Sequence, residues 1–205
     1  MNAEPSQRPA AIILAAGASS RMGSPKPLLK LGGETFADRL IRVFGAHCDP
    51  VILVLGHHAA AVERGLKRHG EAAVVRNPDP DRGQTSSLQT GIAACAGSDF
   101  LFSPVDAPAV SEGTVAMLVA RWRRRTGSEW IFRPRHEGRR GHPVLVCGPV
   151  ARQLAALDPG EPARETIRAH RAETVFVDVD DAGILSDVDE PDEYRTLAAE
   201  WAGGR

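Results

Sequence analysis

The sequence predicts an α/β fold: a mainly parallel sheet with helices on both faces. Short apolar runs alternate with stretches whose apolar residues recur at helical spacing, which is the order of strand–helix–strand units. The chain has 205 residues, of which 42% are hydrophobic and 25% charged, an ordinary balance for one globular domain. We expect a single domain over residues 10–202, after a disordered N-terminal lead-in over residues 1–9.

Seven short runs are predicted as strands because apolar and β-branched residues are concentrated in them. In chain order they are Ala11–Leu14, Val51–Leu55, Ala73–Val75, Phe100–Phe102, Trp130–Phe132, Val144–Cys147 and Thr174–Val179. Ligands of such sheets bind beyond the carboxyl ends of the strands. Polar motifs that follow these strands are therefore expected to converge on one edge of the sheet.

Helices are predicted between the strands from the spacing of apolar residues. One apolar face contains Phe36, Leu40, Val43 and Phe44, a second contains Val115, Leu118, Val119 and Trp122, and residues Gln84–Ala96 form a further helix. A last helix is expected from Pro191, a residue typical of the first helical position, with Asp192 and Glu193 in its first turn.

Composition excludes several classes of function. The net charge of −1 provides no field that would attract the chain to nucleic acid or to an anionic membrane. No apolar run approaches the ~18–20 residues of a membrane span, and the N-terminus lacks an apolar signal core. Cys48, Cys95 and Cys147 are far apart and lie in apolar surroundings, which predicts buried free thiols in a cytoplasmic protein.

The loop after the first strand is the most informative segment. Leu14, Ala15, Ala16 and Gly17 lead into small residues that let backbone N–H groups approach phosphate oxygens, and the cations Arg21 and Lys26 follow. The chain holds three Lys against 22 Arg, and Pro25 and Pro27 flank Lys26. These observations predict a polyphosphate site; the alternative is a plain strand-to-helix turn.

Other phosphate loops do not fit this segment. A Walker loop requires Lys-Ser or Lys-Thr after its last glycine, but Ser24 follows Gly23 here. The dinucleotide pattern of three spaced glycines is also absent from the sequence.

The segment Leu-Ala-Ala-Gly-x-Ser-x-Arg-Met-Gly, followed by Lys26-Pro27-Leu28-Leu29, resembles the signature of the MobA-like NTP transferases. Within that family it is most similar to the molybdenum cofactor cytidylyltransferase (MocA-like) branch. The resemblance implies a Rossmann-like fold of the nucleotide-diphospho-sugar transferase type. It also implies transfer of a nucleoside monophosphate, with CTP favoured because relatives that read Leu-Ala-Gly-Gly use GTP.

Two carboxylates are expected to hold Mg²⁺. Asp106 follows a strand between Pro104 and Pro108, and Ser111 is the better cap of the next helix, so Asp106 has no evident structural task. The resemblance implies that Asp106 binds the metal and that Asp187 completes the site. An acidic helix start is the alternative for Asp187 and the favoured interpretation for Asp189.

Two more segments are candidates for substrate contacts. Gln84, Ser86 and Ser87 begin a helix; they either cap it or, as the resemblance implies, contact the ribose and base. His142 lies in a Gly-His-Pro segment that matches the cytidylyltransferase branch, beside a basic patch that contains Arg133, Arg135, His136, Arg139 and Arg140. That patch either grips the phosphate of the acceptor or is a solvated loop.

The resulting hypothesis is an Mg²⁺-dependent nucleotidyltransferase in which Lys26 and Arg21 stabilise charge on the α-phosphate and the departing pyrophosphate. The resemblance implies molybdopterin or its molybdenum-bearing form as the small phosphorylated acceptor, and a molybdoenzyme or a second copy of the chain as partner. Two alternatives remain: transfer to another small phosphate such as a sugar phosphate, and a nucleotide- or cofactor-binding chaperone without turnover.

Overall fold

The structure is a computed structural model that describes residues 8–95, 99–158 and 160–203. Its main sheet has eight strands, which run β10-β7-β9-β6-β1-β4-β5 from edge to edge, with the short β8 paired to β7. The bounds are β1 Ala10–Ala15, β4 Val51–Leu55, β5 Ala73–Arg76, β6 Phe100–Pro104, β7 Ile131–His136, β8 Arg139–Arg140, β9 Val144–Val146 and β10 Thr174–Asp178.

The sheet is mainly parallel, as expected, and two short strands, β8 and β9, run in the reverse direction. β1 pairs in parallel with β4 on one side and β6 on the other, and β10 pairs in parallel with β7. β9 lies antiparallel between β6 and β7, so it begins at the edge where those two strands end. The segment before β9 is thereby placed at the same edge as the loops after β1 and β6.

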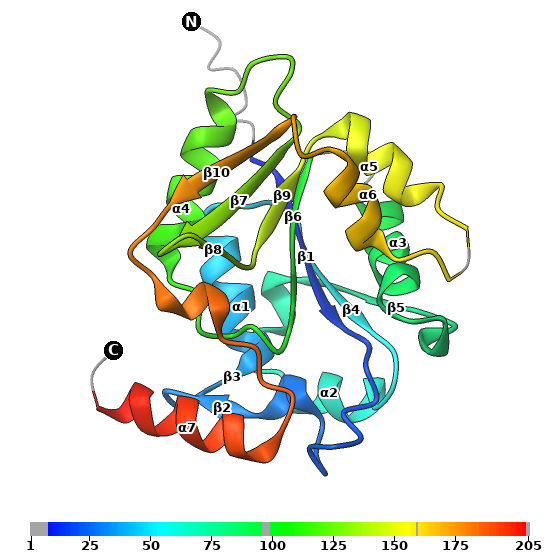
Figure 1. Cartoon of the computed structure of the whole chain (residues 1–205). Helices are drawn as coiled ribbons and strands as arrows, with labels where there is room; N and C mark the ends of the chain where they lie inside the picture. Colours follow the sequence, from blue (N-terminus) through cyan, green and yellow to red (C-terminus); the bar gives the residue numbers. More distant parts are fainter. Residues whose placement is uncertain (1–7, 96–98, 159, 204–205) are drawn as a thin grey trace, which may run out of the picture.

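Helices cover both faces of the sheet (Figure 1). One face packs against α1 (Phe36–Gly45) and α4 (Glu112–Arg123), and the other against α3 (Gln84–Ala94), α5 (Gly148–Ala155) and α6 (Ala163–Ala169). All six residues of β1 are buried because both faces of this central strand are covered. Such a rigid, dry platform fixes where the loop after β1 begins.

Smaller elements complete the fold beside the sheet edge that carries the motifs. A hairpin of β2 and β3 packs against α7, which lies below the hairpin at the bottom of Figure 1. The bounds of these elements are η1 Lys26–Leu28, β2 Lys30–Leu31, β3 Glu34–Thr35, α2 Ala59–Gly65, η2 His69–Glu71, η3 Pro80–Arg82, η4 Ala182–Leu185 and α7 Pro191–Ala202.

Several expected elements are found close to their predicted bounds. The strand Val51–Leu55 is observed as predicted, and α7 begins at Pro191 after a capping box formed by Glu190 and Glu193. Ser111 caps α4, as expected, with its hydroxyl accepting from the N–H of Thr114. The predicted end of the α3 helix at Ala96 lies outside the described residues, as does most of the predicted lead-in 1–9.

All three cysteines are buried and free, as expected. Burial raises the pKa of each thiol to about 12, so the thiols stay protonated and act as small apolar side chains. No helix among the described residues is long and apolar enough to cross a membrane.

Candidate active site

The loop after β1 forms one wall of a hollow of about 250 Å³, here called the loop cavity. It is lined by Leu14, Ala15, Ala16, Gly17, Ser19, Ser20, Arg21, Lys26, Pro27, Pro80, Gly83, Gln84, Ser87, Pro104, Val105, Asp106 and Asp189. Most of the residues predicted for a nucleotide site therefore line one cavity. They meet because β1 and β6 are neighbours whose carboxyl ends lie at the same edge.

The loop is held in place by close packing and by hydrogen bonds. Ser19 accepts from the backbone N–H of Lys26 at 3.0 Å, which closes the loop on itself. A Cβ atom on Gly56, just after β4, would lie 2.7 Å from the carbonyl oxygen of Ala16 and 2.7 Å from Cβ of Pro80. Glycine is thus required where the segments after β1, β4 and β5 approach one another.

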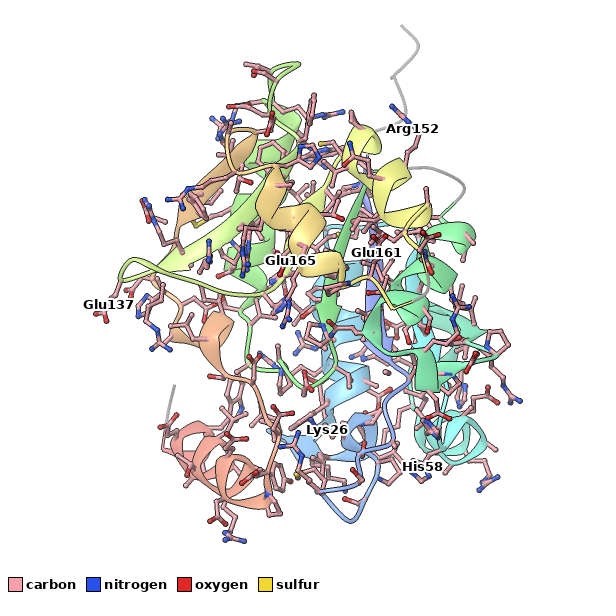
Figure 2. All side chains as sticks on the ribbon, turned by 45° about the vertical axis from the view of Figure 1, so that its right-hand side comes forward. Lys26, His58, Glu137, Arg152, Glu161 and Glu165 are labelled. Atoms are coloured by element: carbon pink, nitrogen blue, oxygen red, sulfur yellow. The ribbon has the colours of Figure 1, made fainter. Side chains whose placement is uncertain are left out.

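Lys26 is the central cation of the loop cavity. Its ammonium Nζ donates to Asp106 Oδ2 at 2.9 Å and to Asp189 Oδ1 at 2.7 Å, and its side chain is 13% exposed. Burial works to lower the pKa of Lys26, but hydrogen bonds and charges from Asp189 and Asp106 outweigh it and the pKa is raised. Lys26 is therefore a fixed positive charge at neutral pH. Figure 2 shows Lys26 in the lower part of the view, below the α6 segment.

Three carboxylates gather around Lys26. The backbone N–H of Val188 donates to the carbonyl oxygen of Asp106 at 2.9 Å, which places the segment before α7 beside the end of β6. The hydrogen bond from Lys26 lowers the pKa of Asp189. Asp187 behaves oppositely: partial burial and the negative charges of Asp106 and Asp189 raise its pKa to about 6.

The structure places a third carboxylate, that of Asp189, against Lys26 in addition to the two that were expected near the metal. Asp189, expected mainly at the acidic helix start, lines the cavity and bonds Lys26, while Asp187 lies outside the cavity lining but close enough to be influenced by Asp106. Among the described residues there is no group of three or more His, Cys, Asp or Glu that would hold a metal. A metal here would depend on one or two carboxylates together with phosphate oxygens and water, which is how Mg²⁺ is usually bound.

Arg21 lies at the solvent side of the cavity. Its side chain is 64% exposed and reaches Glu190 at 3.5 Å and Asp189 at 3.9 Å. Exposed ion pairs of this kind contribute little to stability, so Arg21 can exchange its partners for a phosphate at low cost.

The start of α3 supplies the opposite wall. Gly83, with a φ of +88°, turns the chain into the helix, and Gln84 and Ser87 line the cavity. Ser86 does not line it: its hydroxyl is bonded to the carbonyl oxygen of Gly83 and accepts from Asn77 Nδ2 at 2.8 Å. The geometry thus separates the three candidates into two that face the cavity and one that holds the turn.

A second hollow of about 260 Å³, here called the arginine cavity, adjoins the first. Leu14 and Gln84 line both hollows. The other lining residues are Leu88, Phe102, Arg133, Arg140, His142, Val144, Ala163, Arg164, Ile167, Arg168, Arg171, Thr174 and Phe176. Of the predicted basic patch, Arg133, Arg140 and His142 line this cavity.

Two polar atoms in the arginine cavity are buried without a hydrogen-bond partner among the described residues: Arg133 Nε and His142 Nδ1. Burial, and then the charge of Arg133, lowers the pKa of His142 to about 4, so the imidazole is neutral at pH 7. Burial and the nearby charge of Arg140 lower the pKa of Arg133. Buried polar groups without partners are costly, and they mark a place where a ligand can supply the missing acceptor.

Sequence reasoning missed two parts of this region. The contact between Lys26 and Asp189 joins residues 163 positions apart, and the neighbouring acidic residues gave no means of selecting one. The wall formed by α6, with Arg164, Ile167 and Arg168, was not predicted as a helix. Its amphipathic spacing extends over seven residues, which is too short for a clear periodic signal.

Comparison with known proteins supports the resemblance noted in the loop. Residues 11–175 match the MobA-like NTP transferase domain. The molybdenum cofactor cytidylyltransferase of Escherichia coli strain K12 is 27% identical over 185 residues, which cover 90% of this chain and 93% of that protein.

Solved structures show the same architecture. That of Rv0371c from Mycobacterium tuberculosis H37Rv superposes with a TM-score of 0.79 at 26% identity, covering 94% of this chain and 99% of that one. A structure of Rv0371C in complex with manganese gives a TM-score of 0.76 at 25% identity over 94% and 99% of the two chains. Because the matched domain covers most of the chain, including every residue that lines the loop cavity except Asp189, the chain belongs to the family of MobA-like NTP transferase domains.

Proposed function

We propose that this nucleotidyltransferase moves CMP from CTP onto a phosphate of a small acceptor and releases pyrophosphate, with molybdopterin or the molybdenum cofactor as the acceptor. The observation that carries the proposal is Lys26, buried between Asp106 and Asp189 at the end of a small-residue loop. The choice of CTP rests on Ala15 and Ala16 in that loop and on the E. coli relative.

A divalent cation fits the residues present. Three carboxylates, Asp106, Asp187 and Asp189, lie near the single ammonium of Lys26; partial burial, and then the charges of Asp106 and Asp189, raise the pKa of Asp187 to about 6. We assign Mg²⁺ to Asp106 and Asp187, because Mg²⁺ prefers carboxylate oxygens as protein ligands. When bound, Mg²⁺ would neutralise phosphate charge and polarise the α-phosphorus. The Rv0371C structure in complex with manganese is consistent with a divalent metal.

In the proposed reaction, an oxygen of the acceptor phosphate attacks the α-phosphorus of CTP in line, a new P–O bond forms, and the bond to pyrophosphate breaks. Lys26 leaves its carboxylate partners and binds the α-phosphate, where its charge is needed as negative charge builds up. Arg21 releases Glu190 and binds the departing pyrophosphate. Positioning and charge neutralisation supply the catalysis, as is usual for transfer at phosphorus.

The two substrates are assigned to the two cavities. The loop cavity receives the nucleotide. Gly17, Gln84 and Ser87, which line this cavity, contact the phosphates and the sugar of the nucleotide. The arginine cavity receives the acceptor, since it meets the loop cavity at Leu14 and Gln84 and is lined by guanidinium groups. His142 is neutral and contributes a hydrogen bond rather than charge.

A thermal-shift panel of CTP, GTP, UTP and ATP, each with Mg²⁺, tests the proposal. A ligand that binds only the folded protein raises Tm by mass action, and a concentration of 100 Kd stabilises by about 2.7 kcal/mol. CTP is expected to give the largest shift, and Lys26→Ala to reduce it. A larger shift with GTP would overturn the choice of nucleotide, and no shift with any of the four would overturn the proposal as a whole.

A further inference from the structure

Three guanidinium groups of the arginine cavity have no hydrogen bond or ion pair in the part of the chain that the structure describes: Arg133, Arg140 and Arg171. The other two arginines of the lining, Arg164 and Arg168, lie 3.5 and 3.1 Å from Glu165. Among the described lining residues none is an Asp or a Glu. The cavity therefore carries surplus positive charge, part of it buried, that an anionic ligand would neutralise.

The position of this charge across the sheet is informative. From β1 the strands follow in the order β6, β9, β7 and β10, and adjacent strands are about 4.8 Å apart. Arg133 lies on β7, three spacings from β1 and two from β6, which corresponds to roughly 14 and 10 Å. Arg140 lies on β8, which pairs with the same edge of β7 as β9 does, and Arg171 precedes β10 at the opposite edge of β7.

Reactive atoms have to approach to about 3–3.5 Å for in-line transfer. Lys26 and Asp106, at the ends of β1 and β6, define where the α-phosphorus of the nucleotide binds. A phosphate held between Arg133 on β7 and Arg171 before β10 lies two to three strand spacings from β6, roughly 10–14 Å, which is too far to attack it. Arg140 and Arg171 also line a shallow hollow with Arg135, Gly138, Arg139 and Phe176, at the opposite end of the cavity from Leu14. Figure 2 shows Glu137, at the turn after β7, well to the left of Lys26.

From this arrangement we infer that the acceptor carries two separate anionic groups: the phosphate that reacts, beside Gln84, and a second anion about 10 Å away, bound by Arg133, Arg140 and Arg171. Between them lies an apolar wall formed by Phe102, Ile167 and Phe176, against which the body of the acceptor packs. The inference rests on the proposed function for the identity of the reacting phosphate. In this arrangement the unpaired arginines bind the second, remote anion and not the phosphate that attacks the nucleotide.

Simple bisphosphates test the two-anion requirement by isothermal titration. Hexanediol bisphosphate spans the two positions, propanediol bisphosphate is too short, and hexyl phosphate has one anion. The long bisphosphate is expected to bind at least about tenfold more tightly than hexyl phosphate, because its second phosphate adds charge-assisted hydrogen bonds to the arginines. The short bisphosphate is expected to bind no better than hexyl phosphate.

The double variant Arg140→Gln/Arg171→Gln is expected to lose this preference, so that the long bisphosphate binds no better than hexyl phosphate, while its affinity for CTP is unchanged. The matched control is Arg123→Gln, an exposed arginine of α4 on the other face of the sheet, which is expected to behave as the unmodified protein. Equal binding of the long and short bisphosphates, or a preference that survives in the double variant, would overturn the inference.

Each titration is run with and without CTP and Mg²⁺, which separates this inference from the proposed function. Binding of CTP without a preference for the long bisphosphate contradicts the two-anion acceptor alone. A preference for the long bisphosphate in a protein that binds no nucleotide contradicts the proposed function and leaves the anion sites of the cavity supported.

Discussion

Asp187→Asn is expected to stabilise the protein while it impairs catalysis. In the folded state the pKa of Asp187 is about 6, against an ordinary value of 3.8, because of partial burial and the neighbouring charges of Asp106 and Asp189. The folded protein thus binds a proton more tightly than the unfolded chain. Ionised Asp187 opposes folding at neutral pH, and the asparagine removes this charge without a large change of shape.

The size of the effect follows from the shift. About two pKa units correspond to about 3 kcal/mol at 1.36 kcal/mol per unit. Asp187 remains exposed to solvent, which screens the interaction, so we expect about 1 kcal/mol. For a chain of this length, 1 kcal/mol corresponds to an increase in Tm of about 2–4 °C.

Through Asp187, the stability of the protein depends on pH. A raised folded-state pKa means that the stability of the unmodified protein falls as pH rises from about 4 through about 6. The advantage of Asp187→Asn is therefore absent near pH 4 and complete above pH 7. Calorimetric melts without metal between these limits measure it, with Asp180→Asn, an exposed carboxylate of the preceding loop, as control. A variant that melts at or below the unmodified protein at pH 7.5 would refute the reasoning.

Three further results are expected. Lys26→Ala and Asp106→Asn should each lower kcat/KM at least about 100-fold, or ~2.7 kcal/mol, in a pyrophosphate-release assay, and near-normal turnover would rule out the assigned roles. Gly56→Ala should raise KM for the nucleotide, because its Cβ would lie 2.7 Å from the carbonyl oxygen of Ala16; an unchanged KM in a folded variant would contradict this packing argument. His142 should show no titration by NMR between pH 5.5 and 8 because its pKa is lowered to about 4, and a midpoint near 6.5 would show that the imidazole is not buried as described.

Local pattern predicted the scaffold better than it predicted the contacts within the site. The strand Val51–Leu55 and the start of α7 at Pro191 depend on nearby residues, namely an apolar run and a first-turn proline. The loop with Lys26 was recognisable because small residues and a lysine between prolines are unusual in an arginine-rich chain.

The remaining features depend on chain segments that are far apart. Asp189 is selected over its acidic neighbours by the geometry of the turn before α7, which the sequence does not encode in a short pattern. Ser86 donates to the carbonyl oxygens of Asp79 and Gly83 instead of lining the cavity, whereas Ser87, which also accepts from Asn77, does line it. The rotation with which α3 begins decides between the two serines. The unpaired charge of Arg133 could not be predicted, because it depends on the cavity that α6 and the sheet form together in the folded chain.

The most direct test of the central claim is pyrophosphate release from CTP and Mg²⁺ in the presence and absence of molybdopterin. We expect release that requires the acceptor, is faster with CTP than with GTP, and is lost in Lys26→Ala protein that retains its fold by circular dichroism. No release with any nucleoside triphosphate, from protein that binds CTP and the acceptor, would contradict the proposed transfer reaction.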